Sequence, residues 1–144
     1  VEGSNHRLSE IHSAIGIKQL EQLPEFNKRR REIVEMYNKL LKDTNLILPA
    51  ETENAERCNH LYVIRVDAEK RSIILEEMKK HGIFLGIHYP IPCHKQKVII
   101  DKLGYLPELP VTEKLAKEII SLPIYPDLTD DEVKFVCEKL KRVL

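Results

Sequence analysis

The side chains best suited to chemistry gather in residues 86–94, which read Gly-Ile-His-Tyr-Pro-Ile-Pro-Cys-His. The apolar residues before them predict a strand over 83–88, which would deliver His88 and Tyr89 at its end. The two prolines that follow fix the chain in an extended form. A rigid loop that carries the imidazoles of His88 and His94 and the phenol of Tyr89 can line a pocket for a polar ligand. The alternative is that the prolines only shape a turn and the histidines only end the strand.

Three side chains in this stretch, those of His88, Cys93 and His94, are of types that bind metal ions. Their spacing matches no familiar zinc motif, and no second ligand pair lies nearby in the sequence, so we expect no metal site. Other catalytic signatures are also missing. No serine lies in a Gly-x-Ser-x-Gly turn, and the five glycines form no phosphate-binding loop. The residues alone therefore favour ligand binding without indicating a particular reaction.

Composition narrows the class of protein. The 144 residues are enough for one domain, and 23 basic and 23 acidic side chains give a formal net charge of zero. This balance argues against a protein that works mainly by binding nucleic acid. No apolar run approaches the ~20 residues of a membrane span, so we expect no membrane partner. The three cysteines are widely spaced and odd in number, which predicts a reducing, cytoplasmic location rather than a disulfide framework.

The first predicted element of secondary structure is a long helical segment. Residues 4–42 have the apolar spacing of a helix, with an interruption at Pro24. We expect Ser4 or Asn5 to cap the first helix and Pro24 to lie in the first turn of a second one. The basic residues 28–31 lie on this second helix, where we expect them to face solvent.

A small sheet is predicted in the middle of the chain. The pattern favours a strand over 61–66, a helix over 67–81 that ends at Gly82, and a second strand over 83–88. Such a unit could be parallel, with the helix as its crossover, as in ferredoxin-like folds.

Further helices are expected after this unit. Residues 97–103 and 112–121 predict two short helices, and an extended segment follows over 122–126. The last helix has the clearest start, because Thr129 and Glu132 form a capping box. The fold class is therefore α+β, with a long N-terminal helical segment and a small sheet that has helices on one face.

Four blocks of the sequence together carry a resemblance to a known family. They are residues 3–16, residues 19–37, residues 60–62 with 88–92 and 94, and residues 122–133. In order and spacing they resemble the DegT/DnrJ/StrS family of pyridoxal-phosphate-dependent sugar aminotransferases, which have fold type I. Two departures are that His6 stands where the family usually has an aromatic residue, and that residues 97–99 lack its usual Pro and Tyr.

The resemblance implies that residues 1–144 form the C-terminal, small domain of such an enzyme, with residues 1–42 packing on a large domain. These enzymes move an amino group from glutamate to a keto group on a nucleotide-linked sugar, and they work as homodimers. The lysine that attaches pyridoxal 5′-phosphate lies in the large domain. We therefore expect no catalytic residue here, no tight cofactor binding, and no activity from this chain alone.

The resemblance also implies roles for particular residues. Asn5 would reach across a dimer interface to the cofactor phosphate of the partner subunit, although it could equally be a plain helix cap. Arg7 would add charge near that phosphate or the substrate, or else pair with a neighbouring carboxylate. His88, Tyr89 and His94 would lie on the sugar-nucleotide side of the cleft.

Two other functions stay open at this point. Some members of the same family are sugar dehydratases, in which a histidine replaces the cofactor lysine. A different class is a stand-alone ferredoxin-like binding or regulatory module, which the predicted strand–helix–strand unit would favour.

Overall fold

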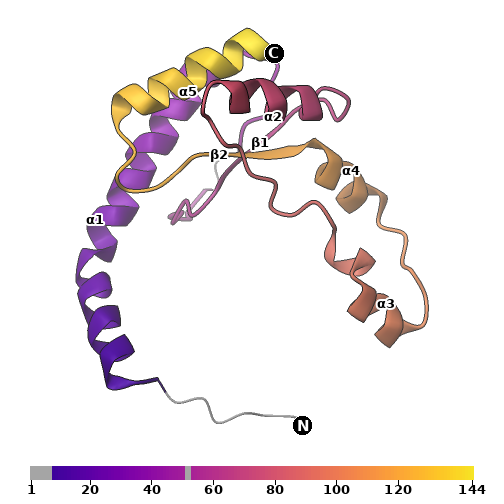
Figure 1. Cartoon of the computed structure of the whole chain (residues 1–144), viewed down its shortest axis with the longest axis horizontal. Coiled ribbons are helices and arrows are strands. Elements are labelled where there is room, and N and C mark those ends of the chain that lie inside the picture. Colours follow the sequence, from indigo (N-terminus) through magenta and orange to yellow (C-terminus); the bar gives the residue numbers. More distant parts are fainter. Residues whose placement is uncertain (1–7, 51–52) are drawn as a thin grey trace.

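The computed structural model describes residues 8–50 and 53–144. Its elements in chain order are α1 (Glu10–Leu41), β1 (Tyr62–Arg65), α2 (Arg71–Lys80), the 3-10 helix η1 (Cys93–Lys95), α3 (Lys97–Leu103), α4 (Pro110–Glu118), β2 (Ile119–Leu122) and α5 (Asp130–Val143). Figure 1 shows an open arch: α1 forms one limb, α3 and α4 form the other, and α2, α5 and the strands lie at the top.

The long N-terminal segment is one helix rather than two. α1 continues through Pro24, so the predicted interruption is wrong. Pro24 is exposed, and the carbonyl oxygen that loses its amide partner there can bind water instead. The helix is capped by Ser9, whose Oγ accepts a hydrogen bond from the His12 N–H. The predicted caps at Ser4 and Asn5 lie outside the described residues.

The sheet differs from the prediction. β1 and β2 pair in antiparallel register, with Tyr62 opposite Leu122 and Ile64 opposite Ile120. Residues 83–88 form no strand and contribute one antiparallel bridge, between Gly86 and Ser121. The predicted parallel strand–helix–strand unit is therefore wrong, and so is the ferredoxin-like interpretation that rested on it.

The physical reason lies in the two segments concerned. Residues 83–88 pair with β2 only at Gly86, and the prolines after Tyr89 cannot extend that pairing. The predicted helix 112–121 instead ends at Glu118, because Ile119 and Ile120 gain more from pairing with β1 than from helical packing. Helix propensity is a weak preference that such tertiary contacts override.

The remaining helices agree better with the sequence. α3 spans the predicted residues and ends at Gly104, whose φ is +74°. α2 begins at Arg71, later than predicted, and Gly82 follows its end with φ +75°. The capping box of α5 is confirmed, with Thr129 N–H donating to Glu132 over 2.8 Å and Glu132 N–H donating to Thr129 Oγ1 over 3.3 Å.

One face of the sheet carries the hydrophobic core. Tyr37 of α1 and Tyr62 of β1 have ring centroids 4.9 Å apart, and the Tyr37 hydroxyl donates to the Pro123 carbonyl over 2.8 Å. The fully buried core side chains of the helices and strands are Ile33, Tyr37, Leu41, Ile64, Ile74, Met78, Ile120, Val133 and Leu140. This arrangement confirms the α+β class with helices on one face.

The basic run 28–31 takes more part in packing than predicted. The guanidinium of Arg29 donates to the Leu128 carbonyl over 2.6 Å and to Asp130 over 2.8 Å, which ties α1 to the start of α5. Arg31 pairs with Glu56 at 2.6 Å. Both contacts join residues far apart in sequence, so local charge patterning could not show them.

Candidate functional site

The loop that follows residue 86 is attached to β2 by its backbone and by a side chain. Gly86 N–H donates to the Ser121 carbonyl over 3.0 Å, and Ser121 N–H donates to the Gly86 carbonyl over 2.8 Å. Nδ1 of His88 lies 2.8 Å from Oγ of Ser121, which is only 4% exposed. The sheet therefore fixes both the path of the loop and the position of the imidazole.

Gly86 has a steric role in this arrangement. A Cβ atom added there would lie 2.6 Å from Cε1 of His88, closer than atoms can approach. The imidazole thus packs directly against the glycine backbone. Sequence analysis singled out His88, but a lone glycine near a strand end gave no sign of this contact.

Tyr89 stands beside His88. Their rings meet edge to face, with centroids 5.5 Å apart and planes at 80°, across a cis peptide bond. Tyr89 is mostly exposed. Its side chain and the prolines after it form one wall of a largely apolar cavity of about 460 Å³, whose lining residues are Tyr89, Pro90, Ile91, Pro92, Cys93, Gln96, Thr112, Leu115, Ala116 and Ile119. A largely apolar cavity with a phenol in its wall can hold an amphipathic small molecule.

His94 lies in different surroundings. It is 7% exposed, and its Nε2 is 3.3 Å from Oε1 of Glu113 in α4. The ammonium of Lys95 contacts the other oxygen of the same carboxylate at 2.5 Å. The hydrogen bond from Lys95, followed by that from His94, lowers the pKa of Glu113 to about 2. This cluster holds η1 against α4, and His94 is not part of the cavity wall.

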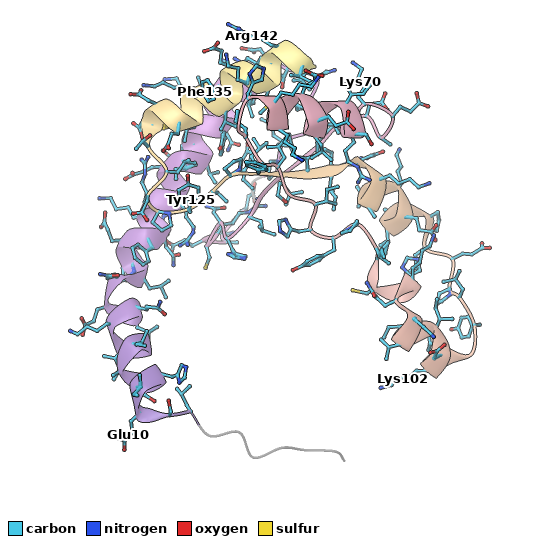
Figure 2. The ribbon with its side chains drawn as sticks, viewed as in Figure 1. Glu10, Lys70, Lys102, Tyr125, Phe135 and Arg142 are labelled. Atoms are coloured by element: carbon cyan, nitrogen blue, oxygen red, sulfur yellow. The ribbon has the colours of Figure 1, made fainter. Side chains whose placement is uncertain are left out.

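The structure thus brings together two of the predicted site residues, His88 and Tyr89, and turns His94 toward α4. Asn5 and Arg7 lie outside the described residues. Figure 2 shows side chains of the loop after α2 reaching into the space under the arch. The sequence pattern did not indicate Ser121 or Glu113, because each contacts a histidine that lies far from it along the chain.

Within residues 8–50 and 53–144, no three His, Cys, Asp or Glu side chains gather as metal ligands would. No helix in that part of the chain is both long enough and apolar enough to cross a membrane.

Comparison with known proteins agrees with the resemblance in the sequence. The model of the DegT/DnrJ/EryC1/StrS aminotransferase family matches residues 1–141. The dTDP-3-amino-3,6-dideoxy-alpha-D-galactopyranose transaminase of Aneurinibacillus thermoaerophilus is 36% identical over 140 residues, which cover 97% of this chain and 38% of the relative.

Solved structures show the same similarity in three dimensions. DesV of S. venezuelae matches 99% of this chain and 38% of its own, with a TM-score of 0.89 and 28% identity. NtdA of Bacillus subtilis, solved with bound cofactor PMP, matches 98% of this chain and 33% of its own, with a TM-score of 0.86 and 30% identity. The chain therefore spans between 33% and 38% of the length of these relatives. It belongs to the DegT/DnrJ/EryC1/StrS aminotransferase family.

Proposed function

We propose that this chain is the C-terminal part of a pyridoxal-phosphate-dependent aminotransferase that moves an amino group from glutamate to the keto group of a nucleotide-linked sugar. Residues 1–144 would form the small domain, and residues 1–42 would pack on a large N-terminal domain. The observation that carries the proposal is the family match over residues 1–141, in relatives that are much longer than this chain. The named relative, which is a transaminase of a dTDP-linked amino sugar, supports the substrate class.

The exposed surface of α1 supports a covering domain or subunit. In the N-terminal part of α1, Ile11, Ile15 and Leu20 are 74%, 53% and 66% exposed. Contiguous apolar surface of this kind marks an interaction site in a soluble protein. We propose that the large domain and the partner subunit of a homodimer cover it.

The described residues do not by themselves fit a pyridoxal phosphate site. A lysine that attaches the cofactor needs a shaped pocket that lowers its pKa. None of the lysines in the described residues is buried. We therefore place the attachment in the rest of the enzyme, where the bound cofactor would serve as an electron sink. For the same reason we expect this chain alone to be inactive and to bind the cofactor weakly.

We further propose the contacts that this part supplies. Asn5 of one subunit would bind the cofactor phosphate of the other, and Arg7 would add positive charge nearby. His88 and Tyr89 would contact the sugar nucleotide, which is supported by the place of Tyr89 in the wall of the 460 Å³ cavity and by the contact of its ring with that of His88. The burial of His94 against Glu113 favours a role in shaping the loop. The three cysteines are all free, which supports a reducing compartment such as the cytoplasm.

A cofactor titration tests this proposal. The complete product of the reading frame that contains these residues should bind pyridoxal phosphate with its visible absorbance, and this chain alone should not. Asn5→Ala should weaken binding about tenfold, since a hydrogen bond to a charged phosphate is lost. Asn45→Ala, in an exposed turn, is the matched control. If the complete product does not bind the cofactor, the proposal of a pyridoxal-phosphate-dependent enzyme is wrong. If Asn5→Ala and Asn45→Ala weaken binding equally, Asn5 does not contact the cofactor phosphate.

A further inference from the structure

The hydroxyl of Ser121 has a restricted choice of hydrogen-bond partners. Ser121 lies on β2 between Ile120 and Leu122, whose side chains point into the core, so strand alternation places the serine on the opposite face. There it is buried, and Nδ1 of His88 at 2.8 Å is its side chain's one hydrogen-bonding partner among the described residues.

This restriction determines which atom carries the proton. A buried hydroxyl has one hydrogen to donate, and buried donors in folded proteins have acceptors. Nδ1 is the acceptor available to Ser121, and it can accept only when it carries no proton. In the neutral imidazole the proton is then on Nε2. The reverse arrangement, with Nδ1–H donating, would leave the buried hydroxyl hydrogen without an acceptor.

The rest of the ring is also held in place. The backbone of Gly86 lies against Cε1, and the edge-to-face contact with Tyr89 limits rotation of the ring. Nε2 has no hydrogen-bonding partner among the residues that the structure describes, and His88 as a whole is exposed. One nitrogen is therefore fixed by the protein and the other is available to a ligand.

We propose that Ser121 is a positioning residue that holds His88 as the Nε2–H tautomer, so that Nε2 donates a hydrogen bond to an oxygen of the ligand. The ligand group is an acceptor, such as a carbonyl, hydroxyl or phosphate oxygen. That this oxygen belongs to a nucleotide-linked sugar rests on the proposed function, whereas the tautomer does not.

The tautomer is measured directly by nitrogen-15 NMR of this chain, at a pH where His88 is neutral. His88→Gln assigns the ring signals. We expect Nε2 to have the shift of a protonated nitrogen and Nδ1 that of an unprotonated nitrogen that accepts a hydrogen bond. A protonated Nδ1 would overturn the proposal.

Variants of Ser121 separate positioning from simple packing. Ser121→Ala should move the Nδ1 signal to the value of a nitrogen without a hydrogen bond, and Ser121→Thr, which keeps the hydroxyl, should restore it. Ser72→Ala, at an exposed serine of α2, should leave the ring signals unchanged. If Ser121→Ala and Ser72→Ala give the same spectrum as the parent chain, Ser121 does not hold the ring. Should Ser121→Ala fail to fold, the parent spectrum and Ser121→Thr still decide the tautomer.

Kinetics of the complete enzyme test the ligand contact. Ser121→Ala should raise KM for the keto sugar nucleotide several-fold while kcat changes less, and His88→Gln should raise it about tenfold. The double variant should be no worse than His88→Gln, because Ser121 acts through His88. An unchanged KM together with the expected tautomer would overturn the ligand contact alone. An enzyme without aminotransferase activity would instead contradict the proposed function and leave the NMR result standing.

Discussion

Gly86 is a position where one methyl group decides the geometry of the site. We predict that Gly86→Ala displaces the His88 ring, because the added carbon would lie 2.6 Å from Cε1. Because the ring is exposed it can move aside, so the expected cost is that of its lost hydrogen bond to Ser121, about 0.5–1.5 kcal/mol of unfolding free energy, which urea denaturation measures. Gly16→Ala is the control, since nothing lies within 4 Å of its added carbon. Because alanine is the better helix former, Gly16→Ala should leave stability equal or higher. Equal losses for both variants would contradict the predicted contact.

Glu113 should make the stability of the fold depend on pH. Hydrogen bonds from Lys95 and then His94 lower its pKa from the ordinary 4.5 to about 2. A carboxylate whose pKa is lowered by folding stabilises the fold at any pH above its pKa in the unfolded chain. This stabilisation is lost as the pH falls from about 4.5 toward 2. We predict that Glu113→Gln makes the unfolding free energy depend less on pH in this window.

The measurement is a series of urea transitions between those two pH values. Glu108→Gln is the matched control, because this nearby exposed carboxylate makes no ion pair or hydrogen bond among the described residues. The unfolding free energy is plotted against pH for each protein. If the slope for Glu113→Gln equals the slopes of the parent and the control, the contacts of Glu113 with His94 and Lys95 do not stabilise the fold.

For single residues, the sequence indicates which side chains belong to the site better than it indicates which side chains they contact. The motif at 86–94 pointed to His88 and Tyr89, which the structure places side by side. It could not point to Ser121 or Glu113, which lie 33 and 19 residues from the histidines that they contact. Neither serine nor glutamate stood out, because a hydrogen bond between distant residues leaves no periodic pattern.

The start of α5 is the element whose local signal is strongest. We predict that Thr129→Ala destabilises the fold by about 1 kcal/mol, because it removes one half of a capping box. Thr112→Ala, at an exposed threonine of α4 with no side-chain hydrogen bond among the described residues, is the control. Thermal unfolding of the two variants gives the comparison, and a control as unstable as Thr129→Ala would argue against the cap.

Element boundaries were predictable where a local stop or start existed. α3 ends at Gly104 and α5 begins after Thr129, as the sequence indicates. β2 was hidden within a predicted helix, since its pairing with β1 depends on residues more than fifty positions earlier. Residues 83–88 have the composition of a strand, but they pair with β2 at a single bridge, between Gly86 and Ser121. Composition identifies a segment that can be extended, whereas its partner decides whether it pairs.

The exposed apolar face of α1 predicts that copies of this chain associate with one another when no other domain covers it. We expect reversible oligomers at rising concentration, and Ile15→Lys should weaken them by placing a charge on the apolar surface. Ala14→Lys adds the same charge at the neighbouring exposed position and removes only a methyl group, so its effect should be smaller. Sedimentation velocity measures both. A chain that stays monomeric at all concentrations would contradict this prediction.

The sequence revealed the molecule's class through four separated blocks rather than through any single motif. Their order and spacing led to the family, and the comparison over residues 1–141 agrees. The blocks could not complete the site, because the chain spans only 38% of a named transaminase relative.

We propose that these residues belong to an enzyme that transfers an amino group to a sugar nucleotide. The most direct measurement follows nitrogen-15 from labelled glutamate into a keto nucleotide sugar, using the complete product of the reading frame and, separately, this chain. We expect labelled amino sugar with the complete product and none with this chain. Loss of water from the sugar without nitrogen transfer, or no reaction of the complete product with keto nucleotide sugars, would contradict it.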